Sequence, residues 1–223
     1  FAETNQEALD LHIQAFRLAE ELSVPVMVCM DGFILTHAYE RVDMPSQEQV
    51  DAFLPPFEPR QVLDPQDPVS MGAMVGPEAF TEVRYLAHVK QMQALDLIPG
   101  WAAEFRKAFG RDSGGLMHEY RMEDADTVVV ALGSVLGTIK DTVDELRGKG
   151  HRIGVLGITC FRPWPTAAIR QALARAKRVV VVEKAFGVGL GGIVSANVRT
   201  SYGGSLDDVY TVIAGLGGRP ITR

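Results

Sequence analysis

The stretch that decides the fold is DTVVVALGSVLGTIKDTVDELRGKGHRIGVLGI, residues 126–158. It contains two continuous apolar runs, Thr127–Leu132 and Arg152–Ile158, on either side of a segment with helical periodicity, Val135–Gly148. Apolar strands that do not alternate with polar residues are typical of a parallel sheet covered on both faces. The stretch therefore predicts a strand, a helix and a second strand joined as a right-handed β-α-β unit.

The same alternation continues to the end of the chain. We expect a helix over Pro165–Ala176, a strand over Arg178–Glu183, a helix over Gly191–Ser201 and a strand over Val209–Ala214. Alternating strands and helices indicate a sheet with helices on both faces. Residues 111–223 are therefore predicted to form an α/β domain with a parallel sheet, in which the first three strands lie side by side.

The first forty residues have the pattern of one helix followed by one strand. Thr4–Glu7 has capping-box spacing, and the helix after it carries its polar side chains on one narrow stripe, formed by Asp10, Gln14, Arg17 and Glu21. The apolar run Val24–Met30 is typical of a strand covered on both faces. Because the chain begins at Phe1 without a methionine and enters this helix at once, we expect residues 1–40 to be the end of a larger α/β domain.

A proline-rich segment follows, and residues 41–110 are predicted to be a linker with connecting helices. Six of the twelve prolines fall between residues 41 and 70, where they favour an extended chain. Disorder is the alternative, but apolar side chains favour a docked segment; they are Val50, Phe53, Leu54, Phe57, Val62 and Leu63. A helix is expected from Gly76-Pro77 to about Leu97, and a second one over Trp101–Phe109.

Composition excludes several classes of function. The formal net charge is −6, and the 22 Lys and Arg form no basic run, which argues against a nucleic-acid partner. Apolar runs stay far below the roughly 20 residues that span a bilayer, so no membrane segment is expected. Cys29 and Cys160 are too few for a thiolate metal site or an iron–sulfur cluster, and they favour a reducing compartment such as the cytoplasm.

A glycine-rich turn resembles a nucleotide-binding motif. Gly187, Gly189, Gly191 and Gly192 follow a predicted strand and open a helix, and they satisfy the G-x-G-x-x-G spacing of dinucleotide sites. However, the turn follows the third strand of its domain, and the acids Asp207 and Asp208 precede the last strand instead of ending the second one. A structural glycine turn is therefore the favoured interpretation.

Two further turns lie at predicted strand ends. Gly133–Gly137 could receive a phosphate or carboxylate at the start of a helix, although Ser134 is more simply interpreted as a helix cap. The loop Asp31–His37 follows Val24–Met30, at the sheet edge where open α/β folds bind ligands, and its Asp, Thr and His could bind or transfer protons. A simple Asp-Gly turn is the alternative. The other histidines have no neighbours at metal-ligand spacing, and no metal site is predicted.

Longer motifs resemble a known enzyme family. Val24–His37, Phe53–Phe57 and Gly76–Tyr85 in the first half resemble the alpha subunit of pyruvate synthase-type 2-oxoacid:ferredoxin oxidoreductases. The second half continues the resemblance; its matching segments are Tyr120–Ala125, Gly133–Thr138, Phe161–Pro163, Gly189–Gly192 and Ile213–Arg219. The resemblance covers essentially the whole chain. One departure is the apolar turn after Lys184, where the family is expected to carry a polar loop.

The resemblance implies an oxidoreductase that decarboxylates pyruvate with thiamine diphosphate and Mg²⁺, transfers the acyl group to coenzyme A and reduces ferredoxin through iron–sulfur clusters. It further implies that residues 1–40 end a pyrimidine-type domain and that residues 111–223 are a transketolase C-terminal-like domain. A beta subunit would bind the diphosphate, and iron–sulfur subunits would carry the clusters. Catalytic residues are expected upstream of Phe1 or on a partner chain, and this chain alone is expected to bind no cofactor and to be inactive.

Within that resemblance, the residues expected near the cofactor are Asp31, Gly32, Phe33 and His37. Two other functions stay open. A sister enzyme would act on branched-chain or other 2-oxoacids, and a nucleotide-binding module would use the turn from Gly187 to Gly192.

Overall fold

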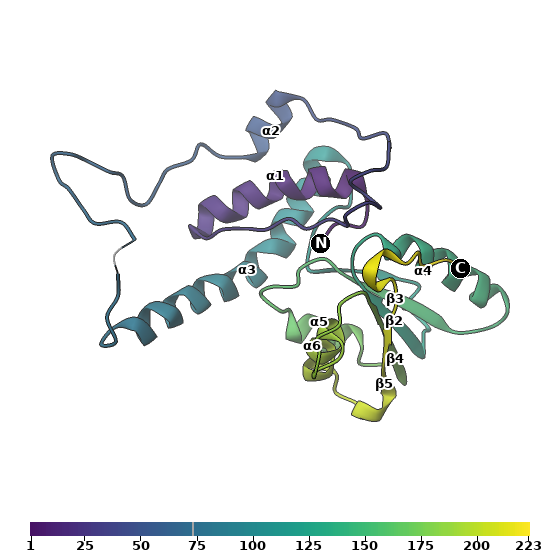
Figure 1. Cartoon of the computed structure of the whole chain (residues 1–223). Helices are drawn as coiled ribbons and strands as arrows, with labels where there is room; N and C mark the ends of the chain where they lie inside the picture. Colours follow the sequence, from purple (N-terminus) through teal and green to yellow (C-terminus); the bar gives the residue numbers. More distant parts are fainter. Residues whose placement is uncertain (73) are drawn as a thin grey trace.

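The computed structural model describes residues 1–72 and 74–223, so that Ala73, inside the predicted linker, lies outside the described residues. The chain forms a helical part, which contains α1 (Asn5–Leu22), α2 (Gln47–Phe53) and α3 (Phe80–Phe109), and a sheet domain that follows it (Figure 1). A short connector, residues 110–116, joins α3 to the first strand. No described helix is long and apolar enough to cross a membrane.

The sheet domain contains five strands in the order β1-β3-β2-β4-β5. Their bounds are β1 Met117–Tyr120, β2 Thr127–Ala131, β3 Ile153–Ile158, β4 Arg178–Glu183 and β5 Val209–Ile213. The pairs β2–β3, β2–β4 and β4–β5 are parallel, which confirms the predicted arrangement of the three central strands. Strand β1, which was not predicted, pairs with β3 in the antiparallel direction and makes the sheet mixed.

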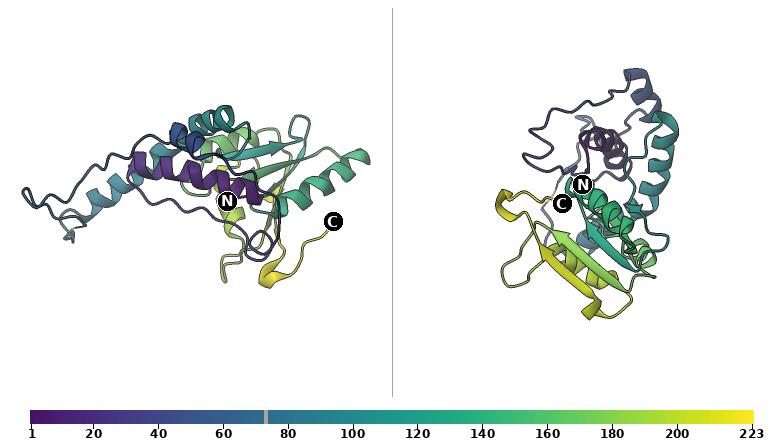
Figure 2. Two further views of the ribbon diagram at one scale, coloured as in Figure 1. Left: turned by 90° about the horizontal axis from the view of Figure 1, so that it is seen from above. Right: turned by 90° about the vertical axis from the view of Figure 1, so that its right-hand side faces the viewer.

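Helices cover both faces of the sheet (Figures 1 and 2). On one face α4 (Val135–Gly148) packs through Val135, Leu136 and Val143, and α4 has the predicted bounds. On the other face lie α5 (Thr166–Ala172) and α6 (Ile193–Ser201), whose Ile169, Leu173, Val194 and Val198 join the main core. The alternating pattern of the sequence is therefore realised as three packed layers.

Helix α1 buries polar residues as well as the apolar Ala8, Ile13 and Leu22. Glu7, Asp10 and Gln14 on its polar side are buried against the connector and the sheet domain, whereas Phe16 is 60% exposed. Asp10 is 0% exposed and accepts hydrogen bonds from Arg111 Nε at 2.9 Å, Arg111 Nη2 at 2.7 Å and Ser113 Oγ at 2.7 Å. The polar side of α1 is thus the contact between the helical part and the sheet domain.

The predicted strand Val24–Met30 is not a strand in the described chain. The segment is extended, and its described backbone contact to another segment is a hydrogen bond from Ala2 N to Cys29 O at 2.9 Å. Met27 is 84% exposed. The physical reason for the difference is that a strand forms only against a neighbouring strand, and the described residues bring none to this segment.

The linker also differs from the expectation. Phe53 ends a short helix and packs on Ile13 and Phe105, with Val50 and Leu54 beside it, so docking of these residues is confirmed. Phe57, Val62 and Leu63 are exposed, so the predicted docking of these three is wrong. Two helices were expected around Pro99-Gly100, but α3 runs unbroken through both residues. Both residues are exposed, and Pro99, which has no N–H, removes one backbone hydrogen bond of the helix.

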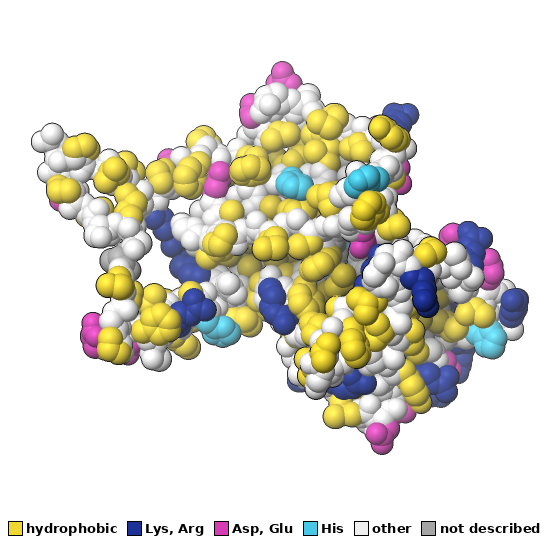
Figure 3. Space-filling model, viewed as in Figure 1, with side chains coloured by type: hydrophobic (Ala, Val, Ile, Leu, Met, Phe, Trp, Pro, Cys, Tyr) yellow, Lys and Arg dark blue, Asp and Glu magenta, His cyan; other side chains and the backbone are white. Residues whose placement is uncertain are grey.

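An arm projects from the body of the molecule. It consists of the segment between α2 and α3 together with the first half of α3 (Figures 1 and 2). Apolar side chains lie uncovered along it (Figure 3); they include Phe57, Leu63, Met74, Phe80, Tyr85 and Leu86. A soluble protein rarely leaves so much apolar surface in one region unless that region is an interface.

Candidate functional site at the carboxyl edge of the sheet

The candidate site lies where the parallel strands end. Strand β2 leads into Gly133 and Ser134, β3 leads into Thr159–Pro163, and β4 leads into Lys184 and the glycine turn. Open α/β sheets bind their ligands at this edge. The Asp31–His37 loop from the helical part reaches the same edge through Asp31, so this loop meets the Gly133–Gly137 turn there.

Asp31 joins the two parts of the chain. Its Oδ2 accepts a hydrogen bond from the backbone N of Ser134 at 2.6 Å, and its Oδ1 lies 3.5 Å from Lys184 Nζ. Burial opposes ionisation of this carboxyl, but the hydrogen bonds from Ser134 and the charge of Lys184 outweigh it, so the pKa of Asp31 lies below its ordinary value. Gly133 has φ +77°, and a Cβ there would come within 3.0 Å of Asp31 Oδ2. The close approach therefore favours glycine at this position.

The loop after Asp31 is a compact turn. Phe33 has φ +64°, a left-handed conformation that is strained for a non-glycine residue. Its ring stacks on the ring of His37 with centroids 4.7 Å apart, and its N–H donates to Thr36 Oγ1 at 2.9 Å. Phe33 is 77% exposed, and Leu35 is buried at 6%. Asp31 and Leu35 thus hold a turn that presents the rings of Phe33 and His37 outward. A Cβ added at Gly32 would meet no atom within 4 Å.

Ser134 occupies the N-cap position of α4, as interpreted from the sequence, but it does not act as a simple side-chain cap. Its side chain makes no capping hydrogen bond to α4. The start of the helix instead receives a carboxylate, which was the other possibility considered for this turn, and the carboxylate belongs to Asp31 of the same chain. A negative charge at the first turn of a helix is stabilised by the helix dipole and by the free backbone N–H groups.

A second carboxylate of the chain binds backbone amides beside the glycine turn. Glu183, at the end of β4, is 5% exposed and accepts hydrogen bonds from Val194 N at 2.7 Å and Ser195 N at 3.0 Å. Those amides start α6 and are the groups that would contact a bound pyrophosphate in a dinucleotide site. A Cβ on Gly192 would collide with Glu183 Oε1 and Ser195 Oγ. Gly189 and Gly191 have φ of +84° and +91°, whereas Gly187 bridges to Gly191.

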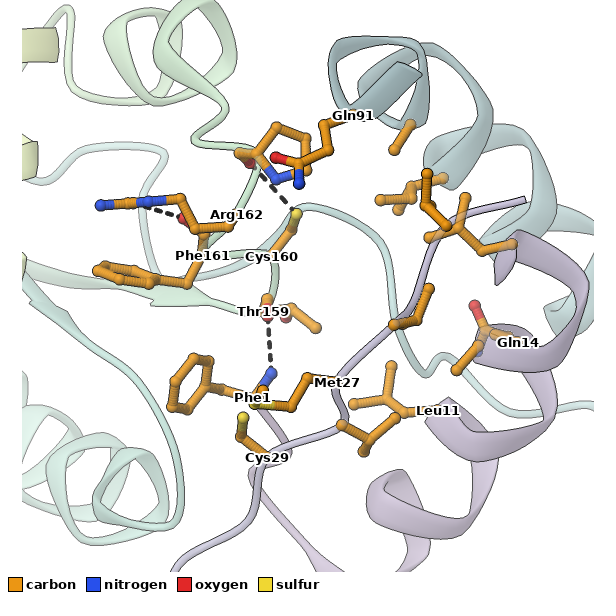
Figure 4. Close-up of a pocket in the computed structure, with 18 of the residues that line it drawn as sticks. Phe1, Leu11, Gln14, Met27, Cys29, Gln91, Thr159, Cys160, Phe161 and Arg162 are labelled. Carbon is orange, nitrogen blue, oxygen red and sulfur yellow. Dashed lines mark hydrogen bonds between the residues drawn. The ribbon is translucent and has the colours of Figure 1, made fainter. Parts of the chain in front are cut away.

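A cavity of about 430 Å³ lies between the helical part and the sheet domain (Figure 4). Its walls come from α1, the segment of residues 24–29, the middle of α3 and the loop Thr159–Pro163. Most of its lining is apolar. The backbone N of Phe1 donates a hydrogen bond to Thr159 O at 2.8 Å, and Cys160 Sγ donates to Pro163 O at 3.4 Å.

The cavity contains residues that analysis of the sequence did not assign to a site. Cys160 and Arg162 lie in the loop after β3, and the signal for them was their position at the end of a predicted central strand. Burial raises the pKa of the Cys160 thiol to about 11, so this thiol is protonated near neutral pH and is a poor nucleophile. Among residues 1–72 and 74–223, no group of three or more His, Cys, Asp or Glu side chains has the arrangement of a metal site.

This edge of the sheet was also tested for thiamine diphosphate. A diphosphate binds at free amides of a helix N-terminus or a glycine turn, usually with a divalent cation. Here the amides at the start of α4 and α6 already hold Asp31 and Glu183. These residues therefore do not fit the diphosphate.

The chain is similar to known proteins along almost its whole length. Residues 1–99 match the family model described as pyruvate flavodoxin/ferredoxin oxidoreductase, thiamine diP-bdg, and residues 125–223 match the pyruvate:ferredoxin oxidoreductase core domain II. The pyruvate synthase subunit PorA of Methanothermobacter thermautotrophicus is 42% identical over 100% of this chain and 58% of its own length. The ketoisovalerate oxidoreductase subunit VorA of Pyrococcus abyssi is 36% identical over 100% of this chain and 57% of its own length.

A solved structure shares the fold. The 2-oxoglutarate:ferredoxin oxidoreductase from Magnetococcus marinus aligns with a TM-score of 0.53 at 19% identity, and the alignment covers 74% of this chain and 27% of the other one. The chain thus spans a little more than half the length of the curated relatives that it matches. Because two models of one family match successive halves of it and a relative is similar over all of it, the chain belongs to the pyruvate:ferredoxin oxidoreductase family.

Proposed function

We propose that this chain works as part of the alpha subunit of a 2-oxoacid:ferredoxin oxidoreductase that converts pyruvate and coenzyme A to acetyl-CoA and CO₂. The observation that carries the proposal is the 42% identity to a pyruvate synthase subunit along the whole chain. The enzyme would use thiamine diphosphate and Mg²⁺ and would pass electrons through iron–sulfur clusters to ferredoxin. Beta and iron–sulfur subunits would be its partners, and the cytoplasm would be its compartment.

The role proposed for this chain is structural. Residues 1–40 would complete a pyrimidine-type domain, residues 41–110 would link the parts, and residues 111–223 would form the transketolase-like domain. The internal carboxylates Asp31 and Glu183 support a division of labour in which a partner chain binds the diphosphate. The exposed arm and the uncovered segment Val24–Met30 support assembly with other protein surfaces.

A second candidate is an enzyme for branched-chain 2-oxoacids. It is favoured by the similarity to the ketoisovalerate oxidoreductase subunit, which is 36% identical over the same length. The difference between 42% and 36% identity puts pyruvate first. A free-standing nucleotide-binding module is the third candidate, and the contacts of Glu183 with the start of α6 count against it.

Turnover by the assembled enzyme tests the proposal. The full-length alpha subunit is reconstituted with the beta and iron–sulfur subunits encoded with it, and reduction of a viologen dye is followed with coenzyme A and thiamine diphosphate. We expect a higher kcat/KM for pyruvate than for 3-methyl-2-oxobutanoate. The reverse order would favour the branched-chain candidate, and no reduction with either acid would contradict both.

The 223-residue chain without partners is expected to give no turnover in the same assay. The control is the complex reconstituted from the full-length alpha subunit and its partner subunits, measured in the same assay. Turnover by the isolated chain, with other subunits excluded by mass spectrometry, would contradict the proposed division of labour.

A further inference from the structure

We propose that Asp31 is a positioning residue of the enzyme, because its carboxylate fixes the aromatic turn Phe33–His37 to the sheet domain through Ser134 N and Lys184 Nζ. The role in turnover rests on the function proposed above. The anchoring itself depends only on contacts within this chain.

The contacts of Asp31 cross between the two parts of the molecule. Ser134 begins α4 after β2, and Lys184 follows β4, so one carboxylate binds the ends of two neighbouring parallel strands. The side chain of Asp31 is 21% exposed and that of Lys184 is 39% exposed, which leaves the ion pair partly shielded from water. A charge-assisted hydrogen bond to a backbone amide is stronger than a neutral one, and here it also satisfies an amide that α4 cannot use.

The turn needs such an anchor. Phe33 has a left-handed backbone at φ +64°, and its exposed ring contacts His37 instead of a core. A strained, exposed turn persists only when its surroundings hold it. Within the described chain, the Asp31 contacts and the burial of Leu35 supply that support.

We expect the contacts of Asp31 to hold the rings of Phe33 and His37 in a precise position. The turn that carries the aromatic pair is held through Asp31 at the sheet edge where ligands of α/β folds bind, and it comes from a different part of the chain than the sheet itself. Small displacements of groups at a reaction centre lower turnover by up to about a hundredfold. Asp31 would therefore act on the reaction through Phe33 and His37, without touching the substrate.

Limited proteolysis tests the anchor without any enzyme activity. Chymotrypsin cleaves after Phe33 only when the turn opens, and the rate is followed by mass spectrometry against cleavage after the fully exposed Tyr39. We expect Asp31→Ala to raise cleavage after Phe33 roughly tenfold. Asp43→Ala is the matched control, because this carboxylate lies in the same segment and pairs with its exposed neighbour Arg41.

Graded variants then separate positioning from general stability. Asp31→Asn keeps an acceptor for Ser134 N but loses the attraction to Lys184, so both protection and turnover should fall in the order Asp, Asn, Ala. Combining Lys184→Met with Asp31→Ala should raise the cleavage rate little above that of Asp31→Ala alone, because both changes remove the same ion pair. In the reconstituted enzyme we expect kcat to fall more than KM changes.

The outcomes are distinct. An unchanged cleavage rate in Asp31→Ala would overturn the anchor. Faster cleavage with unchanged kcat would overturn the positioning role. If the wild-type complex turned over no 2-oxoacid, the proposed function would fail, whereas the anchor would still stand or fall by the cleavage rate.

Discussion

Replacing Asp10 by Ala should strongly destabilise the contact between α1 and the connector. Asp10 is completely buried and accepts bonds from Gln6, Arg111 and Ser113. Removing one partner of a buried ion pair costs about 3–5 kcal/mol, because the other charge is left unpaired. The Arg111 side chain is 24% exposed and can regain some water, so we expect a loss near the lower limit, about 3 kcal/mol.

Urea unfolding followed by the fluorescence of Trp101 and Trp164 measures this loss, because one tryptophan lies in each part of the chain. For a chain of this size the loss corresponds to a fall in Tm of about 6–12 °C. Asp112→Ala is the matched control: this carboxylate is 63% exposed and pairs with exposed Arg106, so its removal should change stability by less than about 0.5 kcal/mol.

A double substitution tests the reason for the effect. Arg111→Met alone should also be costly, since it leaves the buried Asp10 without its partner, but Asp10→Ala with Arg111→Met should cost less than the sum of the two single changes. A loss below about 1 kcal/mol for Asp10→Ala, or strict additivity in the double variant, would refute the account of α1 as a helix docked by its polar side.

Three further predictions concern other contacts. The hydrogen bond to Glu7 raises the pKa of His118 above its ordinary value, so the stabilising charge is complete below about pH 6.5 and is lost as the pH rises through the raised pKa. His118→Gln should therefore lower the free energy of unfolding more at about pH 6 than at about pH 8.5, and equal losses in urea titrations would contradict this. Gly192→Ala should cost about 1–3 kcal/mol, because its Cβ meets the buried Glu183 carboxylate, whereas Gly203→Ala, with open space around it, should be nearly neutral in the same thermal scan. Calorimetric titration with NAD or FAD should show no saturable binding; micromolar affinity that Gly189→Val abolishes would restore the dinucleotide interpretation.

The sheet domain was largely predictable from the sequence because its signals are local. Three continuous apolar runs identified β2, β3 and β4, and the helical period gave α4 its observed bounds. Strand β1 was missed because Met117–Tyr120 is only four residues long and contains His118 and Glu119, so it shows no apolar run. Its pairing with β3 is a tertiary contact, which a local sequence pattern does not predict.

The helical part was less predictable because its stability depends on distant residues. The polar stripe of α1 gives no local sign of its partners, because Asp10 binds Arg111 and Ser113, which lie about a hundred residues further along the chain. The apolar run Val24–Met30 has the composition of a buried strand and lacks a neighbouring strand among the described residues. The composition of a segment shows whether it can form a strand. Whether the strand forms depends on a neighbouring strand from elsewhere in the protein.

In the candidate site, too, the local sequence does not show which group binds the backbone amides. The turns after β2 and β4 both have the sequence of an anion-binding helix start, and in both the anion is a carboxylate of the chain itself. Glu183 reaches amides 11 and 12 residues ahead of it, whereas Asp31 reaches Ser134 across 103 residues. An external phosphate would have to displace a bound carboxylate and approach its negative charge, so these turns favour internal docking over ligand binding. A glycine fingerprint at a strand end therefore predicts a nucleotide site only when no acidic side chain of the protein can reach the same amides.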